Sequence, residues 1–151
     1  MRRGVRHTEH MAVGTLQTIE YPEVGPWREE RTPRPMWTDV EASVRRLDGD
    51  RFPTFGLFFD EGAAPDDVPD FEVLGGLSGY VVTARPADGG EFWFRDDSAP
   101  SEEVQVWVSD QGFACPRFMV CPDVERVVAA TRYFFETGQL LQNFPWSPKF
   151  G

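Results

Sequence analysis

The segment from Cys121 to Gly138 places the strongest constraint on how this chain of 151 residues can fold. Its apolar positions recur at steps of three and four residues, which predicts a helix with one apolar stripe. The stripe consists of Val124, Val127, Val128, Thr131, Phe134 and Phe135. Pro122 suits the first helical position, and Gly138 suits the left-handed residue that ends a helix. A helix with two adjacent phenylalanines needs a broad apolar surface, and we expect a β-sheet to supply it.

The rest of the chain favours strands. Alternating apolar residues and glycine-bearing turns predict strands at residues 55–59, 71–74, 79–85, 91–95, 103–108 and 113–120. One shorter helix precedes them, beginning at Trp37 with Thr38 or Asp39 as its cap. We therefore predict an α+β fold: an antiparallel β-sheet of about five to seven strands, with the short helix of the N-terminal half and the long C-terminal helix packed on one face.

The beginning of the chain is the hardest part to interpret. We expect residues 1–36 to form a leader and a proline-rich loop, with one candidate edge strand between residues 12 and 21, and Met11 is an alternative start. Residues 37–151 are expected to form a single α+β domain. The basic start lacks the apolar segment of a secretory signal. No apolar run approaches the roughly 18 residues of a membrane-spanning helix, so no membrane partner is expected.

The charge balance is strongly acidic. The chain has 15 Lys and Arg residues against 25 Asp and Glu residues, a net charge of −10. Between Phe52 and Pro116 there are 13 acidic residues and only two basic ones, Arg85 and Arg95. Such a surface repels nucleic acid and attracts basic partners. The alternative is that the acidic balance serves only solubility.

The residues needed for common catalytic sites are missing from the predicted fold. Both histidines, His7 and His10, lie in the expected leader, so no Ser/His/Asp or Cys/His site is predicted. Cys115 and Cys121 do not have the spacing of a redox or zinc motif. The adjacent carboxylates of the predicted loops should stay solvated, unlike a buried acid–base pair. We therefore expect neither a cofactor nor a metal site.

Two tryptophans stand out in the predicted strands. If residues 91–95 and 103–108 form a hairpin centred near Pro100, Trp93 lies opposite Trp107 and Arg95 lies opposite Gln105. Both tryptophans would then lie on an otherwise polar outer face, which is typical of an interface. The alternative is that the N-terminal segment or the first helix covers them.

The end of the chain resembles the closing motif of a bacterial immunity-protein family. The resemblance rests on the run from Val127 to Gly138, where a helix ends in an aromatic pair and a Thr-Gly, and on Pro145 and Trp146, which follow a few residues later. Looser similarities are the helix from Trp37, the strand after Pro53 and the glycine hairpin at residues 75–80. The resemblance covers residues 37–146.

This resemblance implies a function in a polymorphic toxin system. Members of the family are often encoded beside nucleic-acid deaminase toxins. The resemblance implies a cytoplasmic, non-enzymatic inhibitor that binds its cognate toxin and blocks the active site. A deaminase that acts on nucleic acid needs a basic substrate channel, and an acidic domain can occupy that channel. Inhibition by binding elsewhere on the toxin is the other possible mode.

The family offers no contact motif to carry over, so the predicted toxin-binding residues come from the charge and register arguments. They are Asp66, Asp67, Asp70, Trp93, Asp96, Asp97 and Trp107. Two alternative functions remain open. One is a small-ligand-binding domain, and the other is an acidic nucleic-acid mimic that inhibits DNA-binding proteins. The oligomeric state is not predicted.

Overall fold

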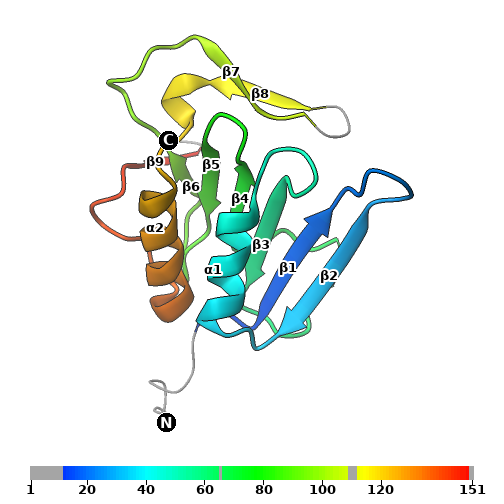
Figure 1. The fold of residues 1–151 in the computed structure, drawn as a ribbon. Helices are drawn as coiled ribbons and strands as arrows, with labels where there is room; N and C mark the ends of the chain where they lie inside the picture. Colours follow the sequence, from blue (N-terminus) through cyan, green and yellow to red (C-terminus); the bar gives the residue numbers. More distant parts are fainter. Residues whose placement is uncertain (1–11, 65, 109–111, 150–151) are drawn as a thin grey trace.

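The computed structural model describes residues 12–64, 66–108 and 112–149. It confirms the predicted α+β fold: a seven-stranded antiparallel sheet carries both helices on one face (Figure 1). The strand order is β2-β1-β3-β4-β5-β6-β9, and β7 and β8 form a separate two-stranded sheet. The strands are β1 (Thr15–Glu20), β2 (Arg28–Pro33), β3 (Thr54–Phe58), β4 (Phe71–Gly75), β5 (Tyr80–Ala84), β6 (Phe92–Phe94), β7 (Glu103–Trp107), β8 (Phe113–Pro116) and β9 (Trp146–Pro148).

The C-terminal helix, α2 (Val124–Thr137), ends as predicted at Gly138, which has φ of 75°. Its start differs from the prediction. Asp123 is the N-cap, and its carboxylate accepts a hydrogen bond of 2.9 Å from the backbone N–H of Glu125. Pro122 therefore precedes the cap instead of opening the helix, because the acidic cap offers a partner to a free backbone N–H.

The shorter helix, α1 (Trp37–Arg46), begins at the predicted residue. Its N-cap is Met36, so the prediction of Thr38 or Asp39 at this position was wrong. Asp39 still serves the helix start, because its carboxylate accepts a hydrogen bond of 2.9 Å from the backbone N–H of Met36. At the other end, Arg45 donates to both carboxylate oxygens of Glu125 at 2.8 and 3.0 Å, which ties α1 to α2.

The main core lies between the helices and the sheet. Phe134 is fully buried there, with its ring centroid 5.3 Å from that of Phe59 and 4.8 Å from that of Phe71. Its neighbour Phe135 packs 5.8 Å from the ring of Trp37 on α1. The two adjacent phenylalanines are thus covered by the sheet and by the other helix. None of the described helices has the length and apolar character needed to cross a membrane.

The N-terminal third contributes more to the sheet than expected. β1 is a strand, as proposed, but it lies between β2 and β3 and is not an edge strand. β2 falls within the expected proline-rich loop and forms one edge of the sheet. Its sequence, REERTP, lacks apolar alternation, so pairing with β1 defines this strand. Met11 and both histidines lie outside the described residues.

The predicted hairpin between the two tryptophan-bearing strands was wrong. β6 pairs with β5 and β9, so Trp93 lies opposite Thr83 and Ser147. β7 pairs with β8, so Trp107 lies opposite Phe113. Gln105 is paired with Ala114 and not with Arg95. The error arose because β9, formed by distant C-terminal residues, occupies the side of β6 assigned to β7.

A second, smaller core lies on the opposite face of the sheet, which we call the outer face. Here the β7–β8 hairpin packs its Val106 and Cys115 against Val81 of β5. Leu74 of β4 borders this cluster, and the short 3-10 helix η2 (Arg117–Met119) and Val120 complete it. The hairpin covers only part of the outer face, and Pro69 of the loop before β4 lies against Gly56 of β3 on the same face.

Candidate functional site

A polar row crosses the outer face beside the small core. Glu72 of β4 pairs with Thr83 of β5, and Thr83 pairs with Trp93 of β6. These residues alternate with Phe71, Val73, Val82 and Phe94, which belong to the main core. Because side chains alternate across a strand, Glu72, Thr83 and Trp93 all point away from the helices. They form the floor of a depression.

This depression, which we call the outer hollow, has a volume of about 220 Å³. One wall comes from Val68 and Pro69 in the loop before β4, and another comes from Phe113 and Met119 beside the β7–β8 hairpin. Charged residues at the rim include Arg85, Glu91 and Lys149. The outer hollow therefore combines an aromatic floor with charges of both signs.

Glu72 is the least solvated carboxylate in the outer hollow. Burial raises the pKa of Glu72, while the charge of Lys149 and a hydrogen bond with the side chain of Thr54 act in the opposite direction. The net shift is upward, so its neighbours compensate only part of the cost of burying this charge. A cationic group of a partner near Glu72 would supply the missing compensation.

Lys149 already places one cation in the outer hollow. Its Nζ lies 5.8 Å from the ring centroid of Trp93 and 3.3 Å from a carboxylate oxygen of Glu91. Its backbone N–H also donates to the carbonyl oxygen of Glu91 at 2.8 Å, directly after β9. The floor thus accepts a cation over an aromatic ring, an attractive arrangement.

The predicted aspartates before β4 have structural partners of their own. The carboxylate of Asp70 accepts a hydrogen bond of 2.8 Å from the backbone N–H of Phe59, and that of Asp67 accepts one of 2.7 Å from Ala64. Asp66 is exposed beside them. This loop continues into Val68 and Pro69, so it flanks the outer hollow.

The predicted aspartates after β6 also hold their own loop. Asp96 accepts hydrogen bonds from the hydroxyl of Ser98 at 2.6 Å and from its backbone N–H at 3.0 Å, and these bonds lower the pKa of Asp96. Asp97 pairs with Arg95 at 2.6 Å. Because β4 and β6 both run antiparallel to β5, the loop before β4 and the loop after β6 lie at opposite ends of the strands. The structure does not bring the two groups of aspartates into one cluster.

Trp107 is separated from Trp93 by the change in strand pairing. It is half-buried in the hairpin, with its ring centroid 5.7 Å from that of Phe113. Its indole Nε1 is buried and has no hydrogen-bond partner within the described part of the chain. Trp93, in contrast, lines the outer hollow. Of the two predicted anchors, Trp93 is the better placed.

Sequence reasoning missed several residues of the outer hollow: Glu72, Thr83, Glu91 and Lys149. A signal for two of them was present, because Glu72 and Thr83 occupy the outward positions of strands whose other residues are largely apolar. Aligning them with Trp93 requires the register of β5 with β6, in which Thr83 pairs with Trp93. Lys149 enters the site only through the pairing of β9 with β6.

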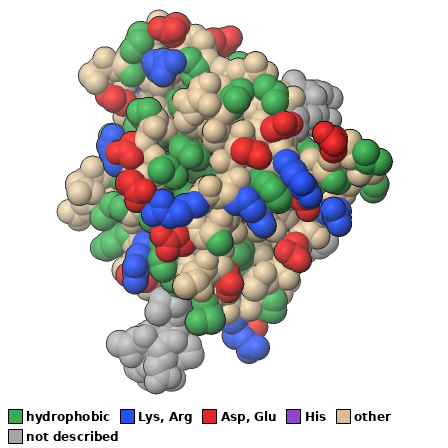
Figure 2. All heavy atoms as spheres, in the orientation of Figure 1, with side chains coloured by type: hydrophobic (Ala, Val, Ile, Leu, Met, Phe, Trp, Pro, Cys, Tyr) green, Lys and Arg blue, Asp and Glu red, His purple; other side chains and the backbone are tan. Residues whose placement is uncertain are grey.

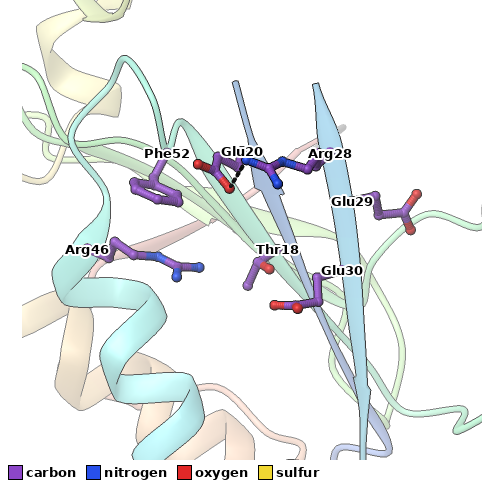
Figure 3. A pocket seen from close by; sticks show the side chains of 7 residues that line it. All are labelled: Thr18, Glu20, Arg28, Glu29, Glu30, Arg46 and Phe52. Atoms are coloured by element: carbon purple, nitrogen blue, oxygen red, sulfur yellow. Dashed lines mark ion pairs between the residues drawn. The ribbon is translucent and has the colours of Figure 1, made fainter. Parts of the chain in front are cut away.

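A second hollow, of about 170 Å³, lies on the helix-bearing side between α1 and the β1–β2 hairpin (Figure 3). Arg46 covers the ring of Phe52 at 4.2 Å, and Arg28 pairs with Glu20 at 3.7 Å. In Figure 3, Glu29 points away from Glu30 and from the hollow. Its one aromatic ring is covered by an arginine of the same chain, so it offers a partner less than the outer hollow does.

The cysteines do not form a reactive or metal-binding site. Cys115 and Cys121 are both free and buried, and burial raises the pKa of each thiol. Cys121 lies two residues before the N-cap of α2, and its raised pKa disfavours an activated thiolate there. Among the described residues, no group of three or more His, Cys, Asp and Glu side chains is arranged to hold a metal ion.

Comparisons with known proteins found no family model, no curated protein and no solved structure that matches this chain. Function is therefore inferred from the residues and their geometry.

Proposed function

We propose that this chain is an immunity protein: a non-enzymatic, cytoplasmic inhibitor that binds a cognate toxin and occludes the toxin's basic active-site channel. The toxin would be a nucleic-acid deaminase, as the resemblance of the closing motif implies. The observation that carries the proposal is the outer hollow. There the half-buried Trp93 and the carboxylates of Glu72 and Glu91 are presented on the sheet face opposite α1 and α2.

At the outer hollow itself, size favours a side chain of a protein partner over a small ligand. Its volume of about 220 Å³ is below the roughly 300–1,000 Å³ of most small-molecule sites. A hollow of this size accommodates a single side chain of a partner. Protein interfaces often centre on an aromatic anchor surrounded by contacts that exclude water. Trp93, with Phe113 and Met119 beside it, has this character.

The charge of the chain supports a basic partner. Between Phe52 and Pro116 there are 13 acidic and two basic residues. Some of the acidic residues lie in the loops at both ends of the sheet, which frame the outer face. Opposite charges steer two proteins together and raise the association rate. A channel that binds the phosphates of a single-stranded nucleic acid has the complementary charge.

A calorimetric titration against the toxin domain encoded beside this chain tests the proposal. We expect nanomolar affinity that largely survives a change from about 50 to about 500 mM salt, because apolar contacts at the anchor do not depend on salt. Deamination by the toxin should stop at one equivalent of inhibitor. The absence of binding would contradict the proposal.

The same titration separates a dedicated inhibitor from a nucleic-acid mimic. An unrelated DNA-binding protein serves as the control partner. A mimic would bind both proteins and lose most of its affinity at the higher salt concentration. An immunity protein should bind the toxin alone.

A further inference from the structure

The turn between β1 and β2, residues 21–27, exposes two large apolar side chains. Val24 is 86% exposed and Trp27 is 54% exposed, and neither belongs to a hydrophobic cluster of the described structure. In Figure 1 this turn projects from the body of the protein at the end of the β1–β2 hairpin. We call residues 21–27 the hairpin tip. Exposed apolar side chains on a projection often mark an interaction site.

The hairpin tip is held in shape by its own residues. The strand pairing ends with Glu20 opposite Arg28, and the next two residues, Tyr21 and Trp27, meet edge to face with ring centroids 6.4 Å apart. The backbone N–H of Tyr21 also donates to the carbonyl of Arg51 at 2.7 Å. Pro22 and Pro26 restrict the backbone on both sides of Val24. Such preorganisation lowers the entropy lost on binding.

Trp27 follows the side of the hairpin that continues the outer face. Along β2, Glu29 and Arg31 point outward: Arg31 lies 5.2 Å from the ring of Phe58, and Glu29 points away from Glu30 in Figure 3. Trp27 is two residues before Glu29, so strand alternation places it on the same side. Trp27 and Trp93 are therefore directed to the same face, at opposite halves of the sheet.

Carboxylates surround the hairpin tip. Residues 20–30 contain four acidic residues and one basic residue. The basic residue, Arg28, pairs with Glu20 at 3.7 Å. Glu23 is exposed in the same turn as Trp27, whereas Glu30 is exposed on the opposite side of β2 and lines the hollow beside α1. Glu29 lies on the same side as Trp27, and its hydrogen bond from Arg31 lowers the pKa of this carboxyl. An aromatic ring with flanking negative charges has the chemical pattern of a nucleobase with flanking phosphates.

We infer that the hairpin tip enters the nucleotide-binding cleft of the toxin, where Trp27 takes the place of the target base and the flanking carboxylates take the place of phosphates. This inference rests on the proposed function, and it names the hairpin tip as the element that blocks the active site of the toxin. Enzymes that act on a base hold it in a pocket between aromatic and apolar side chains, next to a basic groove for the backbone. Val24 would fill the apolar side of that pocket.

The test compares Trp27→Ala with Tyr133→Ala in titrations against the toxin domain. Tyr133 is a matched control, because it is also an exposed aromatic residue (38%) but lies on α2 of the helix-bearing face. We expect Trp27→Ala to weaken binding about tenfold or more and Tyr133→Ala to leave it within about twofold. Both variants should keep the melting temperature of the parent chain, since neither side chain is buried.

A competition experiment locates the hairpin tip on the toxin. A fluorescently labelled single-stranded oligonucleotide is bound to a catalytically inactive toxin, and the inhibitor is added. We expect the parent chain to displace the oligonucleotide and Trp27→Ala to displace it only at about tenfold higher concentration.

The outcomes separate this inference from the proposed function. If the parent chain binds the toxin and Trp27→Ala binds equally well, the hairpin tip is not the element that blocks the active site, while the inhibitor function stands. A ternary complex of toxin, oligonucleotide and parent chain would also overturn the inference. The inference would also be overturned if sedimentation showed that Trp27 mediates self-association and Trp27→Ala left the affinity for the toxin unchanged. If the parent chain does not bind the toxin, the proposed function itself fails.

Discussion

The two faces of the seven-stranded sheet are built from the same strands but differ in what covers them. On one face, α1 and α2 bury a continuous core in which Phe55, Leu57, Phe71, Val73 and Val82 lie against the helices. On the outer face, the β7–β8 hairpin covers only Leu74 and Val81, and the row from Glu72 to Trp93 is left as the floor of a hollow. The first face therefore holds most of the buried core, and we propose that the second binds the partner.

The two faces also differ in how far their charged side chains are paired within the chain. Figure 2 shows basic side chains in a band across the helix-bearing face, with acidic side chains beside them. The arginines of the helices are engaged within the chain: Arg45 with Glu41 and Glu125, and Arg132 with Glu136 and with the ring of Trp37. In the outer hollow, burial instead leaves the charge of Glu72 only partly compensated. A cation of a partner placed near Glu72 would be attracted to this carboxylate.

The largest effect should come from the core of the helix-bearing face. Phe134→Ala removes a fully buried ring that stacks on Phe59 and Phe71, and we expect it to lower the free energy of unfolding by about 3–5 kcal/mol. Urea denaturation measures this change. Tyr133→Ala, the exposed neighbour on the same helix, should cost under about 1 kcal/mol. Similar losses for the two variants would show that the core is not packed as described.

The next largest effect concerns the contact between the turn after β4 and the end of α1. Gly76, in the turn after β4, has φ of 109°, and a Cβ there would lie 2.5 Å from the carbonyl oxygen of Leu47. Gly76→Ala should therefore lower the free energy of unfolding by about 2 kcal/mol or more, because backbone at the end of α1 must shift.

Gly25→Ala is the matched control for Gly76→Ala. Gly25 has φ of 98°, but a Cβ there would meet nothing within 4 Å. Its cost should be limited to about 1 kcal/mol of backbone strain. Equal costs for the two alanines, measured by urea denaturation, would contradict the close approach of Leu47 to the turn.

The smallest effect concerns Glu72 on the outer face, where we expect a substitution to raise the free energy of unfolding and not to lower it. Because burial raises the pKa of Glu72 in the folded chain, folding favours the protonated carboxyl, and stability is lost as the pH rises through the folded pKa. Glu72→Gln cannot ionise, so we expect it to be slightly more stable than the parent chain at pH 7. The advantage should disappear below the ordinary pKa of 4.5. Urea denaturation at both pH values checks this, and a Gln variant that is less stable at pH 7 would contradict it.

The fold was largely predictable because its signals are local. The stripe from Val124 to Phe135 and the glycine at position 138 defined α2, and alternation defined β3 to β5. β2 was missed because charged residues fill it, so only its pairing with β1 makes it a strand. β9 was missed because it is short and pairs with β6, whose residues come more than 50 positions earlier in the chain.

The candidate site was less predictable because it depends on these nonlocal pairings. Trp93 was identified from its polar surroundings, but its predicted partner Trp107 lies in the other sheet. Glu72 and Lys149 meet Trp93 only when β4, β5, β6 and β9 are placed in order. The predicted aspartates before β4 and after β6 lie apart, because strand direction puts the two loops at opposite ends of the sheet.

We propose that the outer face binds the partner and that the helix-bearing face does not. The most direct test measures the affinity for the toxin domain of two single variants, Trp93→Ala and Tyr133→Ala, at about 500 mM salt, where exposed charges are screened. We predict that Trp93→Ala weakens binding about tenfold or more, and that Tyr133→Ala leaves it unchanged. Loss of affinity in Tyr133→Ala with full affinity in Trp93→Ala would contradict the account.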